Sequence, residues 1–288
     1  MQHLGMNKII ELFGTPAGTK EDGNWNAILD RQWRPYLDRK CIKVRKSQPD
    51  ISIGTCSVLY GEDTKPIIFC PFRLLERRQI FTDCLHLLSL HEPGNELHII
   101  PEVSLPGGSV DYFLASVKND KVQDFVGIEL RTLDTTGSVW PERQRFVKSL
   151  GLPAVREDVE SYKTFGMNWK MTAKTILVQL HHKIQTFEHI NKHLILIIQD
   201  HLLSYLQREF QFSHMNAARV GDPMHIHSYA MNKTKGRTYR LDLVSRLSTN
   251  AEGIAISLGL QAEANMELGT IIEQLESKIS AETLFTVG

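Results

Sequence analysis

The sequence predicts an α/β protein with a mixed central sheet flanked by helices. Short apolar stretches alternate with amphipathic ones after residue 96, which is the pattern of a sheet covered by helices. The chain has 288 residues, of which 42% are hydrophobic and 23% are charged. This is the composition of a globular protein with a sizeable core. We therefore expect one large domain with a smaller, cysteine-bearing companion.

The smaller companion is expected to occupy residues 1–95. Residues 6–14 have the spacing of a short helix, and residues 73–90 place apolar side chains at the spacing of an amphipathic helix. Pro93–Gly94 then break the chain. This break predicts a boundary between the companion and a larger domain over residues 96–288.

The larger domain is expected to contain the sheet and the helices that cover it. Alternating or wholly apolar stretches predict strands, and helical spacing predicts helices. The expected strands are Leu97–Ile100, Val110–Val117, Gln123–Thr132, Leu194–Gln199, Met224–Met231 and Tyr239–Leu247. The expected helices cover residues 169–189, 201–210 and 262–280.

Charge and hydropathy limit the functions to be considered. The formal net charge is zero, which argues against a non-specific nucleic-acid binder that relies on phosphate neutralisation, but a sequence-specific one needs only a local basic face. The longest apolar run, Leu194–Ile198, is too short to cross a bilayer. Residues 1–10 lack the features of a signal peptide. We expect no membrane association and a cytoplasmic location.

Residues 31–46 are a candidate for contact with nucleic acid. They carry seven basic side chains and no acidic residue after Asp38. Such a density is typical of a segment that follows a phosphate backbone, and also of a solvated loop face. The candidate DNA-binding residues are Arg39, Lys40, Lys43, Arg45 and Lys46.

The four cysteines all lie in the first third of the chain, at positions 41, 56, 70 and 84. Disulfides are rare in cytosolic proteins, so the clustering indicates either a metal site or a set of buried thiols. The intervals of 15, 14 and 14 residues are not the tight Cys-x-x-Cys pairs of a typical zinc site. Both interpretations stay open on spacing alone.

Two acidic residues on neighbouring strands are the strongest candidates for chemistry. In the strand that contains Glu129, alternate residues share one face, so Glu129 and Arg131 emerge together opposite a wholly apolar face. A loop over Asn119–Lys121 sets a hairpin register in which Asp111 faces Glu129. Directly opposed side chains have Cβ atoms about 4.5–5.5 Å apart, so the two carboxylates would repel each other unless a cation lies between them or one is protonated.

A divalent cation such as Mg²⁺ takes oxygen ligands of this kind, although two solvent-facing acids can also face each other by coincidence. Arg131 points the same way as Glu129 and could stabilise charge on a scissile phosphate. Glu102 lies close enough upstream to supply another carboxylate.

These residues resemble a nuclease signature. Asp111 followed by Glu129-Leu130-Arg131 is similar to the PD-(D/E)xK motif, and residues 127–138 resemble the variant of that motif in the NotI-like type II restriction endonucleases. The likeness covers roughly residues 6–140. It also includes Ser57-Val58 after Cys56, Cys70-Pro71 before Arg73–Glu76, and Ile80-Phe81 before Asp83.

The resemblance implies a Mg²⁺-dependent endonuclease with a restriction-endonuclease-like core, which cuts double-stranded DNA at a short palindrome as a homodimer. Asp111 and Glu129 would hold the metal, Arg131 would support the phosphate, and Glu102 would be an auxiliary acid. The family also carries a four-cysteine metal site near its N-terminus. The resemblance therefore implies a structural iron or zinc ion at Cys41, Cys56, Cys70 and Cys84. This site would help to order the part of the protein that recognises DNA.

The sequence departs from the family pattern at two positions. Arg131 stands where the general motif has lysine, and arginine stays protonated and cannot act as a base. Arg34 stands where a family block begins with cysteine. Three cysteines then match the family site, and Cys84 either supplies a fourth ligand or is a buried thiol.

A rival function fits these departures: the chain could be a catalytically silent DNA-binding or scaffolding protein that retains the nuclease fold. A third option is a repair nuclease without sequence specificity. A separate feature is the pair His225 and His227 on one strand face, which is typical of a structural or DNA-facing role and less often of zinc binding.

Overall fold

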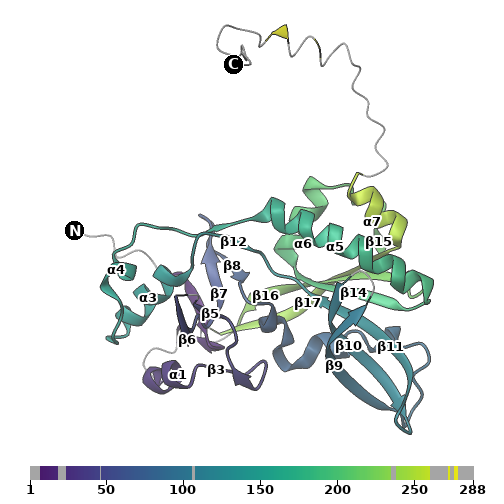
Figure 1. The fold of residues 1–288 in the computed structure, drawn as a ribbon, viewed down its shortest axis with the longest axis horizontal. Helices are drawn as coiled ribbons and strands as arrows, with labels where there is room; N and C mark the ends of the chain where they lie inside the picture. Colours follow the sequence, from purple (N-terminus) through teal and green to yellow (C-terminus); the bar gives the residue numbers. More distant parts are fainter. Residues whose placement is uncertain are drawn as a thin grey trace, which may run out of the picture.

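The largest element of the fold is a seven-stranded mixed sheet (Figure 1). The computed structural model describes residues 7–18, 24–45, 47–105, 108–234, 238–259, 272, 276 and 277. The strand order is β15(Asn216–Ala217), β17(Tyr239–Thr249), β16(Met224–Lys233), β14(His193–Gln199), β11(Lys121–Leu130), β10(Gly108–Lys118), β9(Glu96–Leu105). Strand β14 runs parallel to β11 and to β16, and the other neighbours are antiparallel.

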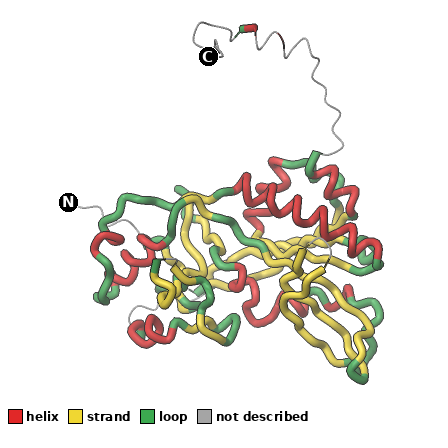
Figure 2. The backbone as a smooth tube through the Cα atoms, viewed as in Figure 1, coloured by secondary structure: helices red, strands yellow, loops and turns green. Residues whose placement is uncertain are grey.

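Helices cover one face of this sheet, and short helical turns cover the other (Figure 2). The first face packs against α5(Trp169–His189), α6(Asp200–Glu209) and α7(Ala251–Ser257). The second packs against η1(Pro71–Arg78), α2(Gln79–Thr82) and η2(Leu85–Leu87). The expected α/β class, with a mixed sheet flanked by helices, is confirmed.

Helix α5 has the bounds that its apolar spacing predicts. Its buried positions, which include Leu177, Leu180 and Ile184, recur every three or four residues and form one stripe. Phe187 at the end of the stripe lies directly on Gly127 of β11. A Cβ atom at Gly127 would be only 2.5 Å from the Phe187 ring. Because Gly127 has no side chain, α5 can approach the sheet closely beside Glu129.

The hairpin of β10 and β11 has the expected register but a shorter turn than expected. Its turn contains two residues, Asn119 and Asp120, both with positive φ, as in the tight turns that suit a hairpin. The expected three-residue loop is therefore wrong by one residue. A bulge next to Val122 compensates for it, so that Tyr112 pairs with Ile128.

A second, four-stranded sheet is formed by the N-terminal part of the chain. Its order is β2(Thr15–Pro16), β1(Ile9–Leu12), β7(Thr55–Tyr60), β8(Lys65–Ile68). Near it lie α1(Trp25–Arg31) and two small hairpins, β3(Trp33–Arg34) with β4(Arg39–Lys40), and β5(Val44–Arg45) with β6(Gln48–Ser52).

One segment from later in the chain packs against this N-terminal part. Helix α3(Trp140–Ser149) places Phe146 against Trp25, and Arg143 donates to the Ile53 carbonyl. Helix α4(Arg156–Val159) and the pair β12(Thr135–Thr136) with β13(Gly166–Met167) flank it. The large sheet begins at Glu96, and the division of the chain after residue 95 stays a prediction.

Two helices expected in the N-terminal part are wrong. Residues 9–12 form strand β1, all of whose residues are buried. Because a short apolar run that is buried on both sides has no distinct periodicity, the sequence cannot distinguish a strand from a helix there. Residues 73–90 form three short pieces because Arg77 and Arg78 adopt positive φ. Their main apolar side chains still reach the core.

The helix expected over residues 262–280 lies outside the described residues, apart from 272, 276 and 277. Among the helices described, none is both long and apolar enough to cross a membrane.

A buried ion pair joins the two sheets. Arg73 is fully buried, and its Nε lies 2.7 Å from Oε2 of Glu11, which also accepts a hydrogen bond from Ser57. The same guanidinium donates to the carbonyl of Tyr239 on β17 at 3.0 Å. This one side chain therefore links β1, η1 and the large sheet.

Glu11→Leu is expected to destabilise the protein by about 3–5 kcal/mol, because it leaves the Arg73 charge buried without its main partner. Urea unfolding followed by circular dichroism measures the change. The double variant Glu11→Leu/Arg73→Met is the control and should recover most of the stability. An unchanged midpoint in the single variant would contradict the role given to this pair.

Candidate active site

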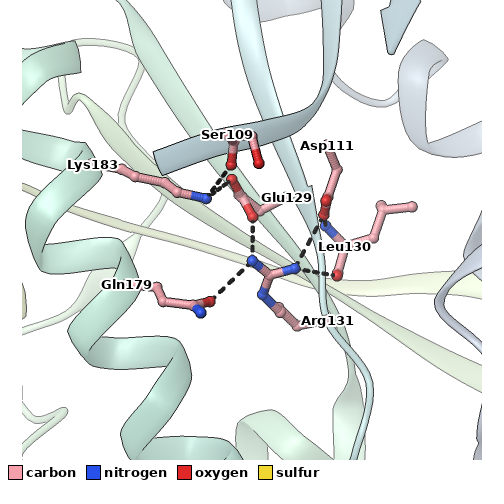
Figure 3. Close-up of polar contacts among 7 residues, drawn as sticks. All are labelled: Ser109, Asp111, Glu129, Leu130, Arg131, Gln179 and Lys183. Carbon is pink, nitrogen blue, oxygen red and sulfur yellow. Dashed lines mark hydrogen bonds and ion pairs between the residues drawn. The ribbon is translucent and has the colours of Figure 1, made fainter. Parts of the chain in front are cut away.

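Asp111 and Glu129 meet on the sheet face that α5 covers (Figure 3). The ladder of β10 with β11 ends at the pair of Tyr112 with Ile128, and Asp111 and Glu129 are the next residues on the two strands. Asp111 Oδ2 accepts a hydrogen bond from the Leu130 N–H at 2.8 Å. Both carboxylates contact the Arg131 side chain, so the structure brings them together, and their direct pairing in the hairpin register stays a prediction.

The Arg131 guanidinium lies where the oxygens of the site converge. Its Nη1 is 3.2 Å from both Asp111 Oδ2 and the Leu130 carbonyl oxygen, and its Nη2 is 2.7 Å from Glu129 Oε2. Gln179 of α5 accepts a further hydrogen bond from Nη2 at 3.0 Å. One guanidinium thus contacts three oxygens that come from two strands (Figure 3).

Lys183 approaches Glu129 from the opposite side. It is 5% exposed, and its Nζ donates to Glu129 Oε1 and, at 2.6 Å, to the Ser109 carbonyl oxygen. Because Ser109 lies on β10 and Lys183 on α5, this contact closes the site between helix and sheet. Glu129 therefore has one oxygen held by Lys183 and the other facing Arg131.

Glu129 is almost completely buried, with 1% of its surface exposed. Burial raises the pKa of this carboxyl, Arg131 and Lys183 act to lower it, and the Asp111 charge raises it further. A buried carboxylate is costly unless it is paired, so the two cations are what keep a negative charge possible at this depth. Such a perturbed group beside a second carboxylate is typical of functional sites.

The oxygen set fits a magnesium ion. Glu129 Oε2 is buried and has no hydrogen-bond donor among the described residues, although Nη2 of Arg131 lies 2.7 Å away as an ion partner. Two carboxylates and a backbone carbonyl are hard ligands of the kind that Mg²⁺ takes together with water. Nowhere in the described part of the chain do three or more His, Cys, Asp or Glu side chains gather in a metal-binding arrangement, so backbone and water oxygens would have to complete the sphere.

Glu102 does not join this network. Its place in the register of β9 is opposite Asp111, between the pairs Val103 with Val110 and Pro101 with Tyr112. However, Glu102 has φ of +48° and is exposed to solvent. Within the described residues it forms no ion pair with the site, so the structure gives no support to the expected auxiliary role.

The basic segment divides into exposed and engaged residues. Arg39, Lys40 and Lys43 are exposed, and Lys43 lies over the ring of Phe69. Arg45 instead pairs with Asp158 at 3.3 Å and packs on Trp140. Lys46 lies outside the described residues.

Arg39 lies near Tyr112, the residue after Asp111. Burial raises the pKa of Tyr112, and the positive charge of Arg39 opposes this rise. Tyr112 packs against Phe81 on the second face of the sheet, so this contact places Arg39 on the side opposite the α5 face that carries the two carboxylates.

Three of the four cysteines gather around Arg34. This arginine is fully buried, and its Nη2 lies 2.8 Å from the Cys41 sulfur. Burial raises the pKa values of the Cys56 and Cys70 thiols, and Arg34 acts to lower both. The structure thus brings Cys41, Cys56 and Cys70 together with the arginine that stands at the position of a family cysteine.

Cys84 lies elsewhere. It is fully buried on the second face of the large sheet, and its sulfur is 3.9 Å from Nδ1 of His227. Cys84 therefore lies apart from the other three cysteines, with the surroundings of a buried core thiol. An iron or zinc ion at Cys41, Cys56 and Cys70 stays a prediction, and within the described residues these side chains form no group that could hold a metal ion.

Lys183 and Gln179 are the site residues that the sequence analysis missed. A signal was present, because Lys183 lies three residues after Leu180 and four before Phe187, on the apolar stripe of α5. A lysine at a core-facing helical position needs a buried partner, and Glu129 is that partner.

Comparison with known proteins adds no assignment to this geometry. Searches against models of protein families and against curated protein sequences find no match to the chain.

Proposed function

We propose that the chain is a Mg²⁺-dependent endonuclease that hydrolyses phosphodiester bonds of double-stranded DNA at a specific sequence, as type II restriction enzymes do. The observation that carries the proposal is the convergence of Asp111, Glu129 and the Leu130 carbonyl on one cation position. The resemblance to the NotI-like endonucleases places the metal-binding residues of that family at the same two carboxylates. A palindromic site would be read by a homodimer.

Asp111 and Glu129 would hold the metal ion, which supplies a polarised phosphate and an activated water when bound. Arg131 is partly exposed and pairs with both carboxylates. On leaving these contacts, the guanidinium would turn toward a phosphate and neutralise its developing charge. The exposed Arg39 and Lys40 would contact the phosphate backbone of the bound DNA.

The structure also contains an observation in favour of a silent protein. Arg131 bridges both carboxylates and Lys183 holds the second Glu129 oxygen, so the site is charge-balanced without any metal. In that case the chain would be a DNA-binding or scaffolding protein that retained the nuclease fold. The two functions differ in whether Mg²⁺ displaces the guanidinium.

The test is incubation of the purified protein with several plasmids and a long phage or genomic DNA in the presence of Mg²⁺ or EDTA. We expect discrete fragments with Mg²⁺ and none with EDTA, because hydrolysis depends on the metal. A continuous smear would favour a repair nuclease without sequence specificity. Intact DNA with Mg²⁺ and with Mn²⁺, together with a gel shift, would favour the silent protein.

A further inference from the structure

The general nuclease motif has a lysine two residues after its acidic residue, and this chain has Arg131 there. Lys183 of α5 is the nearest buried amine to the same carboxylate, and it is 54 residues away in sequence. Its ammonium group has two protein partners, Glu129 Oε1 and the Ser109 carbonyl. Both come from the pair of strands that forms the candidate site.

We propose that Lys183 is the positioning residue of this site, which orients Glu129 so that its second oxygen faces the metal. The proposal rests on the proposed nuclease function and deepens it. Lys183 and Arg131 would have different roles: the buried lysine orients Glu129, and the more exposed arginine contacts the phosphate.

The geometry supports this division of labour. The Lys183 side chain is 6% exposed, whereas that of Arg131 is 27% exposed. With Oε1 bound to Lys183, rotation of the Glu129 carboxylate would cost that contact, so Oε2 stays directed toward Asp111 and Arg131. A residue that fixes a ligand in this way commonly changes metal affinity when it is replaced.

The experiment compares wild type with Lys183→Gln, Lys183→Met and the control Lys174→Met, which removes an exposed lysine from the same helix. Cleavage rates are measured against Mg²⁺ concentration, and Mn²⁺ binding is measured by calorimetry without DNA. We expect both Lys183 variants to need about 10–100-fold more Mg²⁺ and to bind Mn²⁺ correspondingly more weakly. Lys174→Met should behave as wild type.

Lys183→Gln is neutral and one bond shorter than lysine, so it loses the double contact with Glu129 and Ser109, but it stays polar and serves where Lys183→Met fails to fold. If a folded Lys183→Gln protein cleaves DNA with the wild-type Mg²⁺ dependence, the positioning role is overturned and the nuclease stands. If wild type never cleaves DNA but binds Mn²⁺, and Lys183→Gln weakens that binding, the nuclease is overturned and the positioning role is supported.

Discussion

Asp111→Ala is expected to abolish Mg²⁺-dependent cleavage, with a rate loss of about 10³-fold or more. The variant removes one of two carboxylate ligands and so several kcal/mol of stabilisation that the metal gives to the transition state. It also deprives the Leu130 N–H and Arg131 Nη1 of an acceptor. Cleavage of plasmid DNA under single-turnover conditions measures the loss.

The fold should survive this change. The Asp111 side chain is 35% exposed, and Arg131 keeps its shorter contact with Glu129. Thermal unfolding should therefore shift by only a few degrees, since an exposed ion pair contributes about 1 kcal/mol or less. Glu96→Ala, which removes an exposed carboxylate from β9, is the matched control and should cleave as wild type. Full cleavage by Asp111→Ala would remove the proposed metal site.

Acid should destabilise the protein strongly between pH 6.5 and pH 4. Burial lowers the pKa of His225 to about 4, aided by the neighbouring His193, and lowers the pKa of His227 to about 3, aided by Arg246. Both imidazoles are fully buried. In the unfolded chain each would titrate near its usual pKa of about 6.5.

Because the folded-state pKa values are depressed, the stability linked to these groups is fully present above pH 6.5. It is lost as the pH falls toward 4, where the unfolded chain binds protons that the folded one excludes. The loss is at most about 3 kcal/mol per histidine at pH 4, against a total stability of about 5–15 kcal/mol for a typical domain. Urea unfolding at pH 7, 5.5 and 4.5 measures it.

The variant His227→Leu isolates one of the two contributions. The groups that face His227 are His225, His86, Arg246 and, through its sulfur, Cys84, and a leucine there removes the titrating imidazole. Its stability should fall less steeply with pH than that of wild type, whereas His98→Leu at an exposed site should leave the slope unchanged. Equal slopes in all three proteins would show that the acid response comes from other groups.

The sequence predicted the part of the candidate site that lies within the hairpin of β10 and β11. Alternation in β11 determines that Glu129 and Arg131 share a face, and the hairpin brings Asp111 close to them. The loop length inferred for the hairpin was one residue too long, and the bulge after the turn restored the register. The pair was therefore placed correctly because the two apolar faces of the strands had to match.

The rest of the site depends on contacts between distant segments. Lys183 reaches Glu129, and Gln179 reaches Arg131, only because Phe187 packs on Gly127 and brings α5 close to β11. Arg34 joins the cysteines through the folding of the small N-terminal hairpins. No pattern within one segment contains this information.

The sequence by itself determined the α/β class, the bounds of α5 and the shared face of the two site carboxylates, because periodic burial is a local property of helices and strands. Only the tertiary structure decided that residues 9–12 form a strand, that residues 73–90 break at Arg77 and Arg78, and that a helical lysine serves Glu129. These outcomes depend on partners far away in the chain, whose burial and charge outweigh local preference.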